Sequence, residues 1–186
     1  MIIGVATPSH LRSRLERVLA DEPGVEVVDL ATTPNVRIAA VHGALPDGTN
    51  AEVVVPLPLD PIAHLADLLA GEACRLARAS TPASVALTRS GQPLTDGFGV
   101  TFPPPIGARW ATSDGDRWVA TIDGPLVGIA VEATGTAGTA RLGVVDHHDF
   151  LAAIGLAAPV LAALGDGDEL GAARRAGMST AEFVPD

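Results

Sequence analysis

The sequence predicts an α/β fold, in which a βαβ half is followed by a mainly antiparallel sheet packed by a long helix. Within residues 1–32, an apolar run, a helical repeat and a second apolar run follow one another. This order requires two parallel strands with a right-handed crossover. Residues 84–145 instead contain short apolar runs separated by turn residues, which is typical of antiparallel hairpins.

The first half is predicted element by element. Residues 2–5 form a strand, which Ala6-Thr7-Pro8-Ser9 interrupts. In residues 10–21 the apolar positions recur at three and four, the spacing of one helical face. Pro23-Gly24 ends that helix, and strands are expected over 25–30, over 36–42 and, as a buried strand, over 52–57. Asp60 caps a helix that starts at Pro61 and runs to about residue 78.

The second half is predicted to contain strands over 84–88, 99–102, 109–112, 117–123, 126–133 and 140–145. A hairpin turn lies at residues 113–116, and Trp110 and Trp118 flank it at positions that pair across the strands. Asp146 caps a helix over 147–164, which is apolar on nearly every side and is therefore expected to be buried against this sheet. The division is a Rossmann-like half over 1–80, a sheet-and-helix half over 81–165 and a tail over 166–186. One short helix, 169–176, lies in this tail, which is expected to wrap the surface or a neighbour.

Composition limits the classes of function. With 186 residues, 47% of them hydrophobic, the chain can bury a full core. A net charge of −10 argues against nucleic acid or an anionic membrane as partner. No apolar run reaches the roughly 18 residues of a membrane span, and no basic segment precedes an apolar run at the N-terminus. Cys74 is the single cysteine, which excludes an internal disulfide, so a cytoplasmic protein is expected.

The chain contains no lysine and no tyrosine, since all 12 basic residues are arginine. This excludes a Walker-type phosphate loop, a Schiff-base enzyme and any proton transfer by Lys or Tyr. The arginine- and alanine-rich usage is typical of a GC-rich bacterial genome.

Two stretches carry a family resemblance. Ile2-Ile3-Gly4-Val5, Leu15, Leu19-Ala20 and residues 23–28 (PGVEVV) resemble the opening of the Gfo/Idh/MocA oxidoreductases. Residues 51–58 and 68–71 resemble that family's later strand and the helix that follows it. The resemblance covers roughly residues 1–80, and it implies a dinucleotide-binding half followed by an open β-sheet half.

The chain departs from that family at the functional positions. Thr7, Ser9 and Arg12 stand where the family has its Gly-x-Gly-x-x-Gly turn, and Pro8 lies between them. Side chains at these positions obstruct the pyrophosphate of a dinucleotide. Thr32 stands where an acidic ribose ligand is expected.

Two further departures concern the catalytic residues and the length of the half. The family's catalytic Glu-Lys-Pro falls near Ser80-Thr81-Pro82. About twenty residues separate the second strand from Ala51, too few for the family's extra helix–strand–helix. Hydride transfer with NAD(P) is therefore disfavoured, and no cofactor is expected.

The turn that contains Thr7, Ser9, His10 and Arg12 is a candidate ligand site. It lies beyond the carboxyl end of the first strand, where open α/β sheets bind ligands, and helix N–H groups with two hydroxyls suit a small anion. The alternative is an ordinary helix start that Ser9 caps, with Arg12 on a solvated face.

Asp146-His147-His148-Asp149 is a candidate site for a divalent metal, because imidazole and carboxylate ligands together suit such ions. The cluster resembles the Asp-His-His motif of a manganese phosphoesterase family, which also needs earlier aspartates. Asp114 and Asp116 are the only upstream candidates, and they lie in the predicted hairpin turn. In the alternative interpretation Asp146 is a helix N-cap and Asp149 completes a capping box.

Taken together, the residues favour a non-catalytic binding or partner subunit on an oxidoreductase-like scaffold, self-associating through the sheet of the second half. The apolar residues 126–131 and 150–164 motivate the self-association. The alternatives are a metal-dependent hydrolase that uses residues 146–149 and a small-anion sensor at the turn 7–10. His64 is expected on the exposed face of its helix, without a role.

Overall fold

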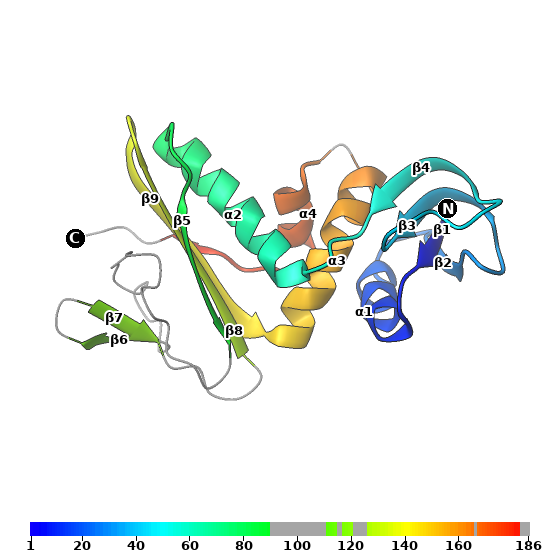
Figure 1. Ribbon diagram of the computed structural model, residues 1–186, viewed down its shortest axis with the longest axis horizontal. Coiled ribbons are helices and arrows are strands. Elements are labelled where there is room, and N and C mark those ends of the chain that lie inside the picture. Colours follow the sequence, from blue (N-terminus) through cyan, green and yellow to red (C-terminus); the bar gives the residue numbers. More distant parts are fainter. Residues whose placement is uncertain (90–110, 115–116, 121–125, 166, 183–186) are drawn as a thin grey trace. The chain divides into compact units, whose positions relative to one another are not determined.

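The computed structural model describes residues 1–89, 111–114, 117–120, 126–165 and 167–182 (Figure 1). The chain forms two compact units. The parallel unit comprises Met1–His64 and Ala152–Met178, and the antiparallel unit comprises Leu65–Leu151 and Ser179–Asp186. This division differs from the expected boundaries at 80 and 165, because the chain passes from one unit to the other inside the helices α2 (Pro61–Ala77) and α3 (His148–Leu164).

The parallel unit contains a four-stranded sheet, and the predicted α/β class is confirmed. Its strands are β1 (Ile2–Ala6), β2 (Glu26–Asp29), β3 (Asn35–Val41) and β4 (Asn50–Pro56). They pair in parallel in the order β2-β1-β3-β4. Helix α1 (Ser9–Leu19) connects β1 to β2 and completes the predicted βαβ unit.

The connection from β2 to β3 is unusually short. These strands flank β1, so residues 30–34 alone must cross it, whereas a parallel crossover typically takes a dozen residues or more. Leu30 is buried in this connection and lies against Gly4 of β1. A Cβ atom at Gly4 would lie 2.7 Å from Leu30 Cγ and 2.9 Å from Val36 Cγ1. The glycine therefore makes room for a crossover that contains no helix.

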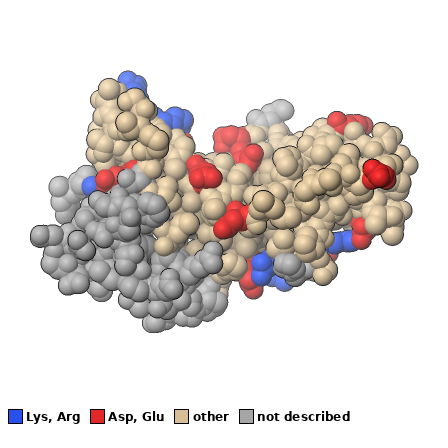
Figure 2. All heavy atoms as spheres, viewed as in Figure 1, with Lys and Arg blue, Asp and Glu red and all other residues tan. Residues whose placement is uncertain are grey.

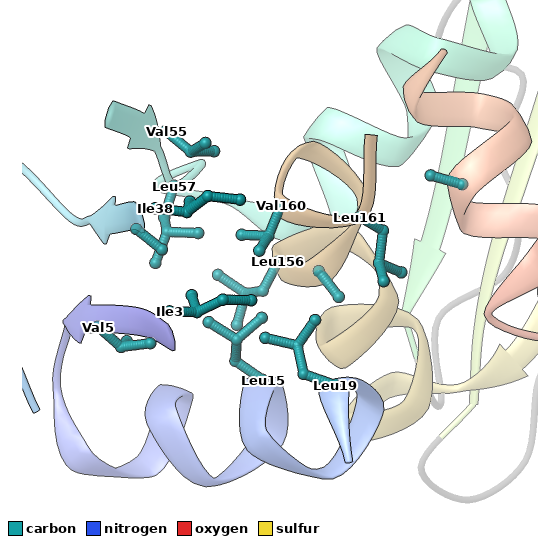
Figure 3. Packing of buried hydrophobic residues seen from close by; sticks show 13 residues of the cluster. Ile3, Val5, Leu15, Leu19, Ile38, Val55, Leu57, Leu156, Val160 and Leu161 are labelled. Atoms are coloured by element: carbon teal, nitrogen blue, oxygen red, sulfur yellow. The ribbon is translucent and has the colours of Figure 1, made fainter. Parts of the chain in front are cut away.

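The core of the parallel unit joins α1 and α3 to one face of the sheet (Figure 3). Its largest members come from β1, α1, β3, β4 and α3, and the segment after β4 adds one more: Ile3, Val5, Leu15, Leu19, Ile38, Val55, Leu57, Leu156, Val160 and Leu161. We expected the long helix to be buried against the antiparallel sheet, but from Ala152 onwards α3 belongs to this core. Because α3 is apolar on nearly every side, its sequence predicts burial without specifying a partner.

Strand β4 was predicted to be buried, and this is wrong. It lies at an edge of the sheet, and Val54 is 47% exposed. Three consecutive valines, Val53 to Val55, give the apolar run of a buried strand, but only Val55 is buried in the core.

The antiparallel unit contains the second sheet. Strands β5 (Ser84–Arg89), β8 (Leu126–Gly135), β9 (Gly138–His147) and β10 (Ala181–Glu182) pair in the order β10-β9-β8-β5. Helix α2 lies along this sheet in Figure 1, and near its C-terminal end Ala137 N donates a hydrogen bond to Ala77 O at 2.9 Å.

Two further strands form the predicted hairpin. Strands β6 (Ala111–Asp114) and β7 (Arg117–Ala120) pair antiparallel on either side of the expected turn. The strand predicted over 99–102 and the residue Trp110 lie outside the described residues.

Within the tail, helix α4 contributes residues to the core and does not only cover the surface. Helix α4 (Glu169–Arg175) forms where a short helix was predicted, and its residues Leu170, Ala172 and Ala173 are buried. Asp168 caps it, because Oδ1 of Asp168 accepts a hydrogen bond from Gly171 N at 2.7 Å. This bond stabilises the charged carboxylate and lowers the pKa of Asp168 below its ordinary value.

Two helix glycines have opposite surroundings and give a paired prediction. A Cβ at Gly155 of α3 would lie 2.9 Å from the carbonyl carbon of Pro61 and closer to its oxygen, whereas nothing lies within 4 Å of one at Gly71 of α2. We expect Gly155→Ala to lower the free energy of unfolding by about 1–3 kcal/mol through overpacking. We expect Gly71→Ala to raise it by roughly 0.5–1 kcal/mol through helix propensity. Urea denaturation followed by circular dichroism measures both, and a stabilising Gly155→Ala would contradict the packing described above.

Candidate functional site at the carboxyl edge of the parallel sheet

The strand order of the parallel sheet reverses between β1 and β3. Ala6 and Val41 are register partners at the ends of these strands, and His42 N donates a hydrogen bond to Ala6 O at 2.9 Å. The residues that follow, Thr7 and His42, therefore lie at neighbouring strand ends. In open α/β sheets this position, beyond the carboxyl ends at the point of reversal, is where ligands bind.

Both residues carry a buried polar atom without a partner. Thr7 Oγ1 and His42 Nδ1 are shielded from solvent, and neither makes a hydrogen bond to any described residue. An unsatisfied buried polar atom costs about 1–3 kcal/mol. Thr7 was a predicted site residue, whereas His42 had been given no role and is brought to the site by the pairing of β3 with β1.

The start of α1 differs from the alternative predicted for it. Pro8 is the N-cap and no side chain caps the helix, so Ser9 is not the cap. The carbonyl of Ser9 accepts a hydrogen bond from Ser13 Oγ at 3.1 Å. The first N–H groups of α1 therefore have no side-chain acceptor. The side chain of His10 lies outside the described part of the chain.

Arg12 is held by two acidic side chains. Its Nε donates to Glu16 Oε1 and its Nη1 donates to Asp29 Oδ2, both at 2.6 Å. The hydrogen bond to Glu16 is the main cause that raises the pKa of Arg12, with Asp29 adding to it. The side chain of Arg12 is 27% exposed and both carboxylates match its charge, so Arg12 lies on a partly solvated face as an ion-paired residue.

Strand β2 ends in a carboxylate, although Thr32 had been assigned to the position of the acidic ribose ligand. Asp29 is the last residue of β2, so it holds the position for which Thr32 had been considered. Its Oδ1 accepts from Ala31 N at 2.9 Å, and its Oδ2 accepts from Arg12. Both oxygens are thus engaged within the chain, at the place where a dinucleotide-binding fold presents a carboxylate to a ribose.

The cluster 146–149 spans the junction of β9 and α3. Because α3 begins at His148, Asp146 belongs to β9 and is not the helix N-cap, which corrects the alternative interpretation. Asp146 Oδ1 accepts from His147 N at 2.7 Å, and His148 Nδ1 lies 3.5 Å from Asp149 Oδ1. Within the described ranges, no group of three or more His, Cys, Asp or Glu side chains is placed to hold a metal ion.

His64 has a partner that could not be predicted from the spacing of residues along the chain. Its Nε2 lies 2.7 Å from Oε2 of Glu169, which is 105 positions away in the chain. The side chain of His64 is 25% exposed, so it is not on a solvated helix face as predicted. Helical spacing identified the leucine stripe of α2, but it contains no information about the element packed beside the other face.

Figure 2 shows the charged side chains on one face of the molecule. On the face drawn in Figure 2, acidic side chains lie singly or in small groups, and most of the described surface is uncharged. Among the helices that the structure describes, no single one is both long and apolar enough to cross a membrane.

Comparison of the chain with protein-family models, with curated proteins and with solved structures finds no match. The structure defines an α/β protein with a four-stranded parallel sheet. The resemblance to the Gfo/Idh/MocA oxidoreductases stays a prediction that rests on residues 1–80 alone.

The Arg12–Asp29 ion pair is testable with a double-mutant cycle. We expect Arg12→Ala and Asp29→Ala to show a coupling energy of about 0.5–1 kcal/mol in urea denaturation, because the pair is partly shielded. The matched control is Arg37–Glu52, which lies at 3.4 Å with Arg37 62% exposed and Arg12 27%. Its coupling is expected near zero. Equal couplings for the two pairs would show that Arg12 does not hold Asp29.

Proposed function

We propose that this chain is a non-catalytic binding protein that takes a small anion at the carboxyl edge between β1 and β3. The observation that carries the proposal is the pair of unpartnered, solvent-shielded atoms at adjacent strand ends, Thr7 Oγ1 and His42 Nδ1. A ligand that hydrogen bonds to both offsets the free energy that their burial costs.

An anion suits the groups around these atoms. The hydroxyl of Thr7 donates a hydrogen bond, and the imidazole of His42 donates through Nδ1–H in one tautomer or when protonated. Helix α1 begins two residues after Thr7, and the N–H groups and dipole of a helix N-terminus favour negative charge. These groups suit a compact anion such as phosphate or a carboxylate better than a cation.

A dinucleotide is a poor fit for the same edge. Thr7, Pro8 and Ser9 carry side chains where a dinucleotide-binding turn needs glycines. The carboxylate of Asp29 is already bound by Arg12 and by the N–H of Ala31. The oxidoreductase family that this chain resembles uses a catalytic lysine, and this chain contains no lysine that could take its place. These features support binding without hydride transfer.

Thr7→Val tests the proposal with two opposite readouts. We expect this variant to bind inorganic phosphate about ten-fold more weakly or worse, since it loses one hydrogen bond to the ligand. We also expect the ligand-free protein to unfold at a higher urea concentration, because the substitution removes an unsatisfied buried hydroxyl. Isothermal titration calorimetry and urea denaturation measure the two effects.

Thr49→Val is the matched control, since Thr49 Oγ1 is also buried without a partner but lies between β3 and β4. It should gain stability and keep its phosphate affinity. Acetate and NAD serve as further probes. Phosphate and acetate both failing to bind, or NAD binding that Thr7→Val leaves unchanged, would refute the proposed site.

We also propose that the protein is cytoplasmic and associates with a second copy of itself through the antiparallel sheet. Strand β5 lies at one end of this sheet and pairs only with β8 among the described strands. Leu87 of β5 is 43% exposed, and an apolar edge strand is a template for pairing with another chain. The single cysteine, which cannot form an internal disulfide, fits a reducing compartment.

Leu87→Glu is expected to convert the dimer to a monomer, because pairing of two β5 strands would bring the introduced carboxylates close together. Light scattering at micromolar protein concentration gives the mass. Leu59→Glu is the control, because Leu59 is 82% exposed in the parallel unit and should leave the mass unchanged. A monomeric mass for the unmodified chain would refute the association.

A further inference from the structure

A groove of about 550 Å³ lies in the parallel unit, apart from the edge between β1 and β3. One wall is the end of β4 and the segment after it, residues 54–58, and the other is α3 with Pro159, Ala162 and Ala163. Figure 3 shows Val55 and Leu57 of the first wall near α3. The volume lies in the range of small-molecule sites, roughly 300–1,000 Å³, and both of these walls are apolar.

Two polar side chains complete the lining, and they are the paired His64 and Glu169. Each lies in the first turn of a helix whose start is fixed. Asp60 Oδ1 accepts from Ile62 N at 3.0 Å at the start of α2, and Asp168 caps α4. The absence of a side chain at Gly155 lets α3 approach Pro61 closely. The fold therefore holds the imidazole and the carboxylate at set positions beside the groove.

The pairing leaves a defined set of groups for a ligand. The 2.7 Å bond uses Nε2 of His64 and Oε2 of Glu169. Oε1 of the carboxylate and Nδ1 of the imidazole take no part in that bond, and with the proton on Nε2 both are acceptors. Among the residues that the structure describes, no arginine lines the groove, and the chain has a net charge of −10. An apolar groove with acceptors at one side matches a ligand that has a hydrocarbon body and a donor group.

We propose that this groove binds a small hydrophobic amine, with the hydrocarbon body between β4 and α3 and the ammonium group on Glu169. An ammonium forms a charge-assisted hydrogen bond to a carboxylate, which is stronger than the bond from a neutral hydroxyl. A carboxylate of the same length meets the charge of Glu169 and is repelled. This site is independent of the anion site, because the two share no residue.

The test uses three probes with one hydrocarbon chain: n-hexylamine, 1-hexanol and hexanoate. Isothermal titration calorimetry on the full chain should show the order amine, alcohol, carboxylate in falling affinity. Glu169→Gln keeps the shape of the side chain and removes its charge, and it should weaken the amine about ten-fold while changing the alcohol little.

Ala163→Leu fills the groove from an exposed position of α3 and should weaken all three probes, whereas Ala20→Leu, at an exposed alanine after α1, should weaken none. Thr7→Val should also leave the amine affinity unchanged, so that failure here and failure of the anion site are told apart. Hexanoate binding as tightly as hexylamine, no binding of any probe, or an amine affinity that Ala163→Leu leaves intact would each overturn the proposal.

Discussion

The contact between Leu30 and Gly4 is the constraint on which the parallel unit depends. Residues 30–34 cross β1 without a helix, and this is possible because Gly4 leaves space for the buried side chain of Leu30. The crossing places β2 and β3 on opposite sides of β1, so the strand order reverses beside β1. The reversal in turn brings Thr7 and His42 to neighbouring strand ends. The crossing lies on one face of the sheet. Helices α1 and α3 pack on the other face, where the main core forms.

Local signals in the sequence predicted much of the fold. The βαβ unit, the cap by Asp60 and the hairpin around residue 115 follow from spacing and turn chemistry within a few residues, and the structure contains each of them. The partner of α3 could not be predicted, because a helix that is apolar on nearly every side fits either sheet. The exposed edge position of β4 was missed because three valines in a row are equally typical of a buried strand.

The residues of the candidate sites were harder to predict than the fold, because their partners are far away in the sequence. Thr7 was predicted because it follows the first strand, but His42 joins it only through the pairing of β1 with β3. Arg12 was predicted to bind a ligand or to lie on a solvated face, but it is paired with Asp29, which is 17 positions away in the chain. His64 and Glu169 are separated by 105 positions. Periodicity shows which side of a helix faces a core, and it cannot show which polar group lies across from the other side.

An unsatisfied hydroxyl is not by itself a binding site, and Thr49 makes this clear. Its Oγ1 is as isolated as that of Thr7, but it lies in the connection between β3 and β4, where no second unpartnered atom is described. At Thr7 the isolated hydroxyl lies beside a strand end that carries an isolated imidazole nitrogen, and a helix without a side-chain cap begins two residues further on. Valine at this position would fill the same space without the penalty of an unpaired polar atom. A polar side chain is favoured there if a ligand supplies the missing hydrogen bond. The unpaired hydroxyl lowers the free energy of unfolding of the unbound protein, and ligand binding raises it again.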